Sequence, residues 1–229
     1  MADPRLRQTL TPDYTIGCKR LAVDSGYYET YNRSNVTLVD ISESSIERII
    51  PAGIRALGQE YTLDALIMAT GFDAMTGTLM KIDIRGRGGS SLNDKWADGP
   101  RTYLGLGMAD FPNLFTITGP GSPSVLTNML QSIEQHVDWI VDCLNYLRAN
   151  EITEIEATQS AEDAWVVHND EVADDHIRNS CSSWYIGANI DDKPRVFMPY
   201  VGGFPRYVDK CNEIAANGYS GFTLSSSSS

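Results

Sequence analysis

An unbroken apolar run, Ala65 to Ala69, lies between a polar lead-in and the glycine at position 71. A short run of this kind predicts a β-strand that is buried on both faces, as in the parallel sheets of α/β proteins. Gly71 can adopt a positive φ and lets another backbone or a flat ligand come close. Phe72 and Asp73 then leave the strand at the end where open α/β sheets place their ligands. Alone, the stretch favours a core strand that ends in a glycine turn, with the edge of a ligand site as the alternative.

Apolar residues recur at helical spacing after Ser124 and predict a helix that is capped by Ser124 and ends at about Ala149. Most of its apolar residues are expected in the core: Leu126, Met129, Leu130, Ile133, Val137, Ile140, Val141, Leu144 and Leu147. Further helices are predicted over residues 160–177, capped by Ser160, and over 204–216, ended by Gly218. Residues 3–10 fit the last turns of another helix.

Short apolar or alternating runs predict the strands. They cover residues 36–39, 45–50, 65–69, 81–85, 114–118 and 195–201, with a hairpin turn at 51–53. The glycine-rich residues 86–91 are predicted to be a surface loop, because the segment after them is too short and polar for the helix of a dinucleotide-binding fingerprint.

The composition excludes several classes of partner. The net charge is −12 and the pI is about 4.6, which argues against binding to nucleic acid or to an anionic membrane. No run approaches the roughly 18 apolar residues of a membrane span, and the N-terminus lacks the apolar core of a signal peptide. The four cysteines are far apart, which fits a reduced, cytoplasmic setting. The three histidines form no ligand motif, so no metal site is expected.

Residues 64–73, Asp-Ala-Leu-Ile-Met-Ala-Thr-Gly-Phe-Asp, resemble the Ala-Thr-Gly segment with which flavin-dependent monooxygenases return the chain from their NADP domain to their FAD domain. Within that group, the chain resembles the type I Baeyer–Villiger monooxygenases from about Asp3 to Leu224. The other stretches that carry the resemblance are 17–20, 26–33, 99–105, 111–115, 119–124, 132–137 and 183–189.

The resemblance implies an α/β fold, the C-terminal portion of a flavoprotein with two Rossmann-like dinucleotide-binding domains. Residues 1–17 would be the tail of a preceding helical segment, and 18–65 the C-terminal part of the NADP-binding domain. Residues 66–224 would be the C-terminal part of the FAD-binding domain, with a mobile loop at about 178–194. Residues 225–229 are expected to be a disordered tail.

The implied activity is that of part of an NADPH- and FAD-dependent monooxygenase. Such an enzyme inserts one oxygen atom of O2 next to a ketone carbonyl, through a flavin C4a-peroxide, and yields an ester or a lactone. The family's two G-x-G-x-x-G fingerprints and its Phe-x-Gly-x-x-x-His signature do not occur here. The chain would therefore need the missing N-terminal half as a partner, and alone it is expected to be inactive. The alternative is a truncated, non-catalytic homologue that acts as a binding or assembly module.

Lys19 and Arg20 form a basic pair in an acidic chain. Without context, such a pair is usually a solvated surface feature. By resemblance, Lys19 matches the lysine that contacts the 2′-phosphate of NADPH, and Arg20 matches the catalytic arginine beside the flavin. A guanidinium keeps its charge, so it can stabilise an anionic oxygen without giving up a proton.

Trp184 and Asn189 match a tryptophan loop that closes over the nicotinamide. Trp184 is also consistent with a half-buried aromatic anchor. After Asn189 the sequence departs from the family, because residues 190–193 read Ile-Asp-Asp-Lys where an apolar residue and Pro-Gly-Lys are usual. Two carboxylates there are expected to weaken cofactor binding unless they face solvent.

The remaining expected site residues follow from the resemblance. Those assigned to cofactor binding are Ala69, Thr70, Gly71, Gly119, Pro120 and Met129. Those assigned to a pocket for a small apolar ketone are Ser124, Val125, Leu126 and Met129, for which plain packing at a helix start is the alternative.

Overall fold

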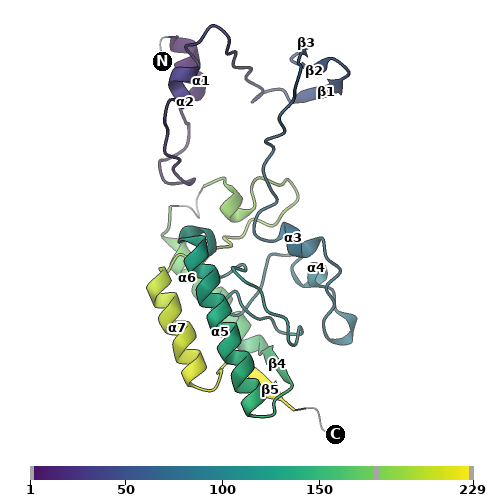
Figure 1. Ribbon diagram of the computed structural model, residues 1–229, viewed down its shortest axis with the longest axis vertical. Coiled ribbons are helices and arrows are strands. Elements are labelled where there is room, and N and C mark those ends of the chain that lie inside the picture. The colour runs from purple at the N-terminus through teal and green to yellow at the C-terminus, as the bar shows by residue number, and fades with distance from the viewer. Residues whose placement is uncertain (1–2, 178–180, 227–229) are drawn as a thin grey trace. The chain divides into compact units, whose positions relative to one another are not determined.

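The structure, a computed structural model, describes residues 3–177 and 181–226 (Figure 1). It divides into two compact units, Met1–Gly71 and Phe72–Ser229, each of which is described by itself below.

The first unit contains two short helices and one small antiparallel sheet. Helix α1 (Pro4–Leu10) begins at Asp3, whose side chain accepts the N–H of Arg5, and α2 is Tyr27–Thr30. Strands β1 (Ile46–Ile50), β2 (Gly53–Ala56) and β3 (Gln59–Thr62) form a sheet in that order. The hairpin predicted at residues 51–53 joins β1 to β2, with Ile50 opposite Gly53.

Two strands predicted in this unit are wrong. Residues 36–39 and 65–69 belong to neither sheet of the described chain. Ile67 is 88% exposed and Met68 is 65% exposed, so the apolar run is uncovered rather than buried. An apolar run forms a strand only when a neighbouring strand takes up its backbone hydrogen bonds, and no described segment does so here. The turn after it is as predicted, since Gly71 has a φ of +81°.

The second unit is built on three helices and a two-stranded sheet. The helices are α5 (Met129–Ala149), α6 (Gln159–Asp174) and α7 (Phe204–Ala216). Strands β4 (Glu154–Ala157) and β5 (Phe222–Ser225) pair antiparallel, with Glu154 opposite Ser225. Short helices α3 (Gly77–Met80) and α4 (Leu92–Lys95) and the 3-10 turns η1 (Arg87–Gly89), η2 (Ser124–Leu126) and η3 (Trp184–Ile186) complete it.

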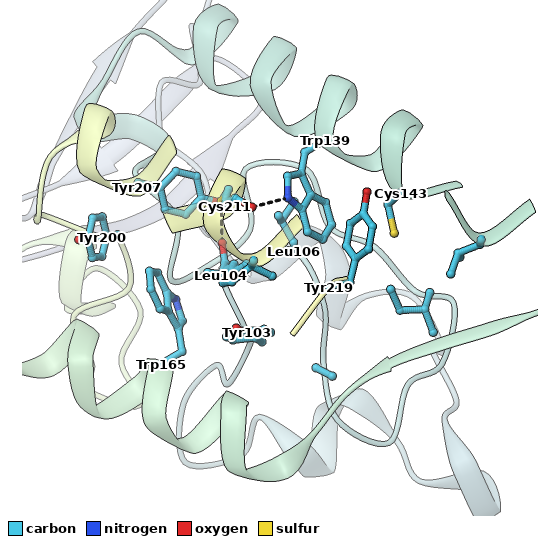
Figure 2. Close-up of a cluster of buried hydrophobic side chains, with 14 residues drawn as sticks. Tyr103, Leu104, Leu106, Trp139, Cys143, Trp165, Tyr200, Tyr207, Cys211 and Tyr219 are labelled. Atoms are coloured by element: carbon cyan, nitrogen blue, oxygen red, sulfur yellow. Dashed lines mark hydrogen bonds between the residues drawn. The ribbon is translucent and has the colours of Figure 1, made fainter. Parts of the chain in front are cut away.

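The core of this unit is aromatic and lies between α5, α6 and α7. Figure 2 shows Trp139 of α5 beside Cys211 of α7, with the indole Nε1 donating to the Cys211 carbonyl at 3.0 Å. Trp165 of α6 stacks on Tyr200, with ring centroids 5.3 Å apart. Burying several large rings together supplies most of the apolar contact area in a unit of this size.

Helix α5 has apolar residues on two faces, which corrects the expectation that most of them are core. The face packed against the core carries Ser132, His136, Trp139, Cys143 and Leu147. On the other side Leu130, Val137, Val141 and Leu144 are exposed. Their spacing of seven, four and three residues places them along one stripe of the helix. Nothing in the described chain covers this stripe.

Several predicted boundaries in this unit are wrong. Helix α5 is capped by Asn128 rather than Ser124, and α6 by Thr158 rather than Ser160, because the capping oxygen must reach a free N–H of the first turn. Helix α6 ends at Asp174 rather than at residue 177. Ser225, expected in a disordered tail, is the last residue of β5, and residues 227–229 lie outside the described residues.

Residues 81–85, 114–118 and 195–201 are not strands. Arg85 forms only an isolated bridge with Ser91. Residues 195–201 share two backbone bonds with the turn at 121–122, from Gly121 N to the Met198 carbonyl and from Tyr200 N to the Ser122 carbonyl. In residues 114–118, the Thr116 N–H donates to the Leu106 carbonyl and the Thr118 N–H to the His136 side chain, so these groups are not paired in a strand ladder.

Candidate functional site

The turn Thr118 to Ser122 is held by the hydroxyl of its own Ser122 and by groups from distant parts of the chain. Three consecutive carbonyls accept side-chain hydrogen bonds: Gly119 from Ser122 Oγ at 2.7 Å, Pro120 from Thr102 Oγ1 at 2.7 Å, and Gly121 from Trp165 Nε1 at 3.0 Å. The Thr118 N–H donates to Nδ1 of His136 at 2.8 Å. A turn fixed by so many partners is organised before any ligand binds.

Gly119 can be nothing but glycine in this arrangement. A Cβ at this position would lie 2.5 Å from Thr116 Oγ1 and 2.6 Å from the Gly105 carbonyl oxygen. Both atoms are fixed, since Thr116 Oγ1 itself donates to the Gly105 carbonyl at 2.8 Å. The backbone of the turn therefore packs directly on residues 102–107 with no side chain between them.

The segment after the turn contacts the tryptophan loop, which is described at residues 181–194; residues 178–180 of the expected mobile loop lie outside the described residues. Val125 and Leu126 pack against a small cluster built on Tyr185, and Trp184 packs against the same cluster. Ser124 is buried and adopts a φ of +42°, with its hydroxyl 3.8 Å from Met75 Sδ. These expected site residues are thus brought together, although Val125 and Leu126 are half-buried in packing contacts.

The side chain of Arg195, which follows the tryptophan loop in the sequence, donates hydrogen bonds to four backbone carbonyls of the loop. Its Nη1 donates to the carbonyls of Gly187, Ile190 and Lys193 at 2.6, 2.9 and 2.7 Å, and its Nη2 donates to that of Asp191 at 3.1 Å. Nη1 carries two hydrogens, so two of its three carbonyl partners share one hydrogen in a three-centre bond, while Nη2 serves the Asp191 carbonyl. The loop is therefore folded around this one side chain.

Three further bonds tie the loop to residues 72–74. Lys193 Nζ lies 2.5 Å from Asp73 Oδ1 and 2.8 Å from the Ala74 carbonyl, and Asn189 Nδ2 donates to the Phe72 carbonyl at 3.1 Å. Asp191 and Asp192 are exposed, but Asp192 also lines the cavity described next, so only Asp191 is placed away from it.

A cavity of about 310 Å³ lies beside these contacts, lined among others by Thr76, Trp96, Lys193 and Met198. The Thr76 hydroxyl is buried, and no group of the described chain bonds to it. Ser183 Oγ, next to Trp184 in the sequence, is also buried without a hydrogen-bond partner in the described chain. Buried hydroxyls normally have a hydrogen-bond partner, so these two hydroxyls remain available to bond to a bound molecule.

The other expected site residues, except Met129, lie in the first unit. Lys19 and Arg20 are exposed, and Lys19 Nζ is 4.4 Å from the centre of the Tyr14 ring. Ala69, Thr70 and Gly71 are exposed as well. Met129, the first residue of α5 in the second unit, is partly buried.

Sequence reasoning missed four residues that shape the site: Thr102, His136, Lys193 and Arg195. His136 and Thr102 lie in stretches that carry the family resemblance. Their roles depend on hydrogen bonds to the turn at 118–122, which the sequence does not reveal. Lys193 and Arg195 follow the unusual Ile-Asp-Asp run. A basic residue after a loop can donate hydrogen bonds to the loop's backbone carbonyls, and this is the signal that could have identified them.

Acetone monooxygenase (methyl acetate-forming) of Gordonia sp. (strain TY-5) is 45% identical over 228 residues, which are 98% of this chain and 43% of that protein. Oxidized steroid monooxygenase bound to NADP matches with a TM-score of 0.89 and 50% identity, over 98% of this chain and 42% of that one. OTEMO in complex with FAD and NADP matches with a TM-score of 0.90 and 39% identity, over 97% and 41%. No protein-family model matches the chain.

The chain is a homologue of the C-terminal part of Baeyer–Villiger monooxygenases. It spans less than half the length of these Baeyer–Villiger relatives. The resemblance to Baeyer–Villiger monooxygenases and the predicted α/β fold class are thereby confirmed. In the part of the chain that the structure describes, no helix is long and apolar enough to cross a membrane. Within the same residues, no group of three His, Cys, Asp or Glu side chains could hold a metal ion.

Proposed function

We propose that this chain is the C-terminal part of an NADPH- and FAD-dependent monooxygenase that inserts one oxygen atom of O2 next to a ketone carbonyl, giving an ester or a lactone. The observation that carries the proposal is the 45% identity along 98% of the chain to an acetone monooxygenase that forms methyl acetate. The geometry supports it, because the turn at 118–122 and the tryptophan loop are both organised in advance by this chain's own side chains.

The residues present fit part of a cradle for the two cofactors. The cavity beside Lys193 keeps an unpartnered buried hydroxyl, that of Thr76, among the described residues. In this proposal Gly119, Pro120 and Met129 lie at the flavin with Ala69, Thr70 and Gly71, and the loop with Trp184 and Asn189 covers the nicotinamide. FAD, once reduced by NADPH, supplies the activation of O2.

The basic pair has two separate roles in the proposal. Lys19 binds the 2′-phosphate of NADPH, for which an exposed ammonium is suited as a compact point charge. Arg20 stabilises the negative charge that develops on oxygen during transfer to the ketone, and it cannot lose its own proton at that moment. Arg20 is therefore the catalytic residue that this segment contributes.

The substrate in this proposal is a small apolar ketone. Val125, Leu126 and Met129 offer apolar side chains beside the turn, and Ser124 offers one hydroxyl. Pockets for small molecules are mostly apolar with a few polar groups, which fits this set.

The partner in this proposal is the N-terminal half that the relatives possess. The exposed stripe of α5, formed by Leu130, Val137, Val141 and Leu144, gives that half an apolar surface to cover. The uncovered apolar run at residues 65–69, which forms no strand in this structure, gives that half a second apolar segment to cover.

The test is a fusion enzyme, in which the part of the Gordonia acetone monooxygenase that precedes the matched region is joined to this chain. We expect the fusion to bind FAD, to oxidise NADPH and to convert acetone or cyclopentanone into an ester or lactone. A folded fusion that binds FAD and oxidises NADPH but forms no oxygenated product from a panel of small ketones would contradict the proposal.

The alternative is a non-catalytic binding or assembly module. It predicts that a folded fusion binds no FAD, whereas the chain alone captures another polypeptide through the α5 stripe. Flavin absorbance of the purified fusion separates the two proposals.

A further inference from the structure

We propose that His136 is a positioning residue, which fixes the turn at 118–122 through one defined tautomer of its imidazole. The proposal rests on the proposed function for its catalytic consequence, because that function places Gly119 and Pro120 at the flavin. The structural part of the proposal stands on contacts within the second unit alone.

The hydrogen-bond directions assign the tautomer. The Thr118 backbone N–H can only donate, so the His136 Nδ1 that it contacts at 2.8 Å carries no proton. The neutral ring then has its proton on Nε2, which lies 2.8 Å from the hydroxyl of Tyr207. Tyr207 has one proton of its own and donates it to the Leu104 carbonyl at 2.7 Å. The three bonds run in one direction, from Thr118 to Leu104, and the Tyr207 hydroxyl also contacts the thiol of Cys211.

The two residues at the ends of this hydrogen-bond series, Thr118 and Leu104, both have an unfavourable backbone conformation. Thr118 has a φ of +53° and Leu104 a φ of +61°, in the left-handed region that non-glycine residues rarely adopt. Each is followed by a glycine of the close contact described above, Gly119 and Gly105. His136 and Tyr207 thus join the two turns that pack backbone against backbone.

The environment favours the neutral ring. His136 and Tyr207 are both 0% exposed. Burial lowers the pKa of His136 to about 4. A protonated ring would turn an N–H toward the Thr118 N–H, which the structure has no means to accommodate.

Two substitutions separate positioning from packing. In His136→Asn the side-chain oxygen can take the place of Nδ1 and accept the Thr118 N–H, while the bond to Tyr207 is lost. In His136→Gln the amide can take the place of Nε2 toward Tyr207, while the acceptor for Thr118 is lost. Asn leaves the larger void, so a role in packing alone predicts that His136→Asn is the more damaged variant.

The first experiment uses the 229-residue chain without any cofactor. Nitrogen NMR of histidine-labelled protein at neutral pH, with the His136 signals assigned by their loss in His136→Asn, is expected to show an unprotonated Nδ1 and a protonated Nε2. Hydrogen exchange at the Thr118 amide is expected to be at least about tenfold faster in His136→Gln than in His136→Asn. The opposite tautomer, or equal exchange in the two variants, would overturn the proposal.

The second experiment uses the fusion enzyme. Misplacing a contact group by about 1 Å can cost roughly 100-fold in rate, so we expect His136→Gln to lose at least tenfold in ester formed per NADPH oxidised. His136→Asn is expected to stay within about threefold of the parent. The reverse order contradicts positioning. If the NMR result holds and the parent fusion makes no ester, the proposed function fails and the tautomer assignment stands.

Discussion

The ammonium of Lys193 lies 2.5 Å from Oδ1 of Asp73, and its side chain is only 9% exposed. This ion pair fastens the tryptophan loop to residues 72–74, beside the cavity that the proposed function uses. A bond of this kind decides how often the loop opens, because a partly buried charged pair with a second acceptor, the Ala74 carbonyl, is not easily replaced by water.

Lys193→Met is expected to open the loop. Hydrogen bonds to charged groups contribute about 1.5–3 kcal/mol, which corresponds to a 10- to 150-fold rise in the open population. Limited proteolysis at residues 187–194 should accelerate by about that factor. The matched control is Lys210→Met, which removes an exposed lysine that pairs with Glu213 at 3.1 Å on the surface of α7. Equal cleavage rates in the two variants would show that Lys193 does not hold the loop.

Glu162→Gln is expected to destabilise the second unit. Glu162 is 0% exposed, accepts the Ala109 N–H at 2.9 Å and lies 2.9 Å from Lys95 Nζ. Removing its charge leaves Lys95 without compensation, a change that costs about 3 kcal/mol when the pair is buried. Urea denaturation should show this loss, whereas Glu213→Gln, at an exposed pair, should change the free energy of unfolding by less than about 0.5 kcal/mol. Similar losses in both variants would contradict the assignment.

Acid should weaken the fold through His136. The pKa of this buried ring is lowered from 6.5 to about 4 in the folded state, so the unfolded chain binds the proton more readily. The stabilisation is therefore complete above pH 6.5 and is lost as the pH falls toward 4, by about 3 kcal/mol. The free energy of unfolding of the parent, minus that of His136→Asn, is expected to fall across this window. A difference that is constant with pH would show that His136 titrates normally in the fold.

The helices were accessible to sequence reasoning because their signal is local. The spacing of apolar residues predicts a helix over 204–216, and α7 has those bounds. The strand predicted at residues 45–50 is confirmed as β1, with its hairpin turn. The other predicted strands are wrong, because an apolar run such as residues 65–69 does not reveal whether a neighbour exists to pair with it. Strands β4 and β5 were missed for the converse reason, since Glu154 meets Ser225 only through a contact between segments far apart in the chain.

The site shows the same division. Val125, Leu126 and Trp184 were expected at the site from the family resemblance, and the structure packs them on one cluster. His136 and Arg195 were missed because their roles depend on which carbonyl or N–H lies within 3 Å, and no sequence pattern specifies that. Apolar periodicity also overstated the core of α5, because it cannot tell a face covered by this chain from one left exposed.

In the fusion enzyme, Lys19→Ala is expected to raise KM for NADPH and to leave KM for NADH nearly unchanged. Losing one charge-assisted contact to a phosphate should cost about 1.5–3 kcal/mol, or roughly 10- to 150-fold. Steady-state kinetics with both nucleotides measure this directly. Equal losses with NADPH and NADH would show that Lys19 does not bind the 2′-phosphate.

Arg20→Ala in the fusion enzyme tests the central claim most directly. Oxygen transfer concentrates negative charge on oxygen, and losing the fixed cation should slow ester formation at least about 100-fold, while NADPH is still oxidised. Arg20→Lys should not restore the ester, because an ammonium lacks the planar fork and can give up its proton. Arg48→Ala, at an exposed arginine of β1, is the control and should leave both rates unchanged. The decisive measurement is the ester formed and the NADPH oxidised in the same reaction. Loss of ester with continued NADPH oxidation is the predicted result, and ester formation near the parent's rate would contradict the catalytic assignment.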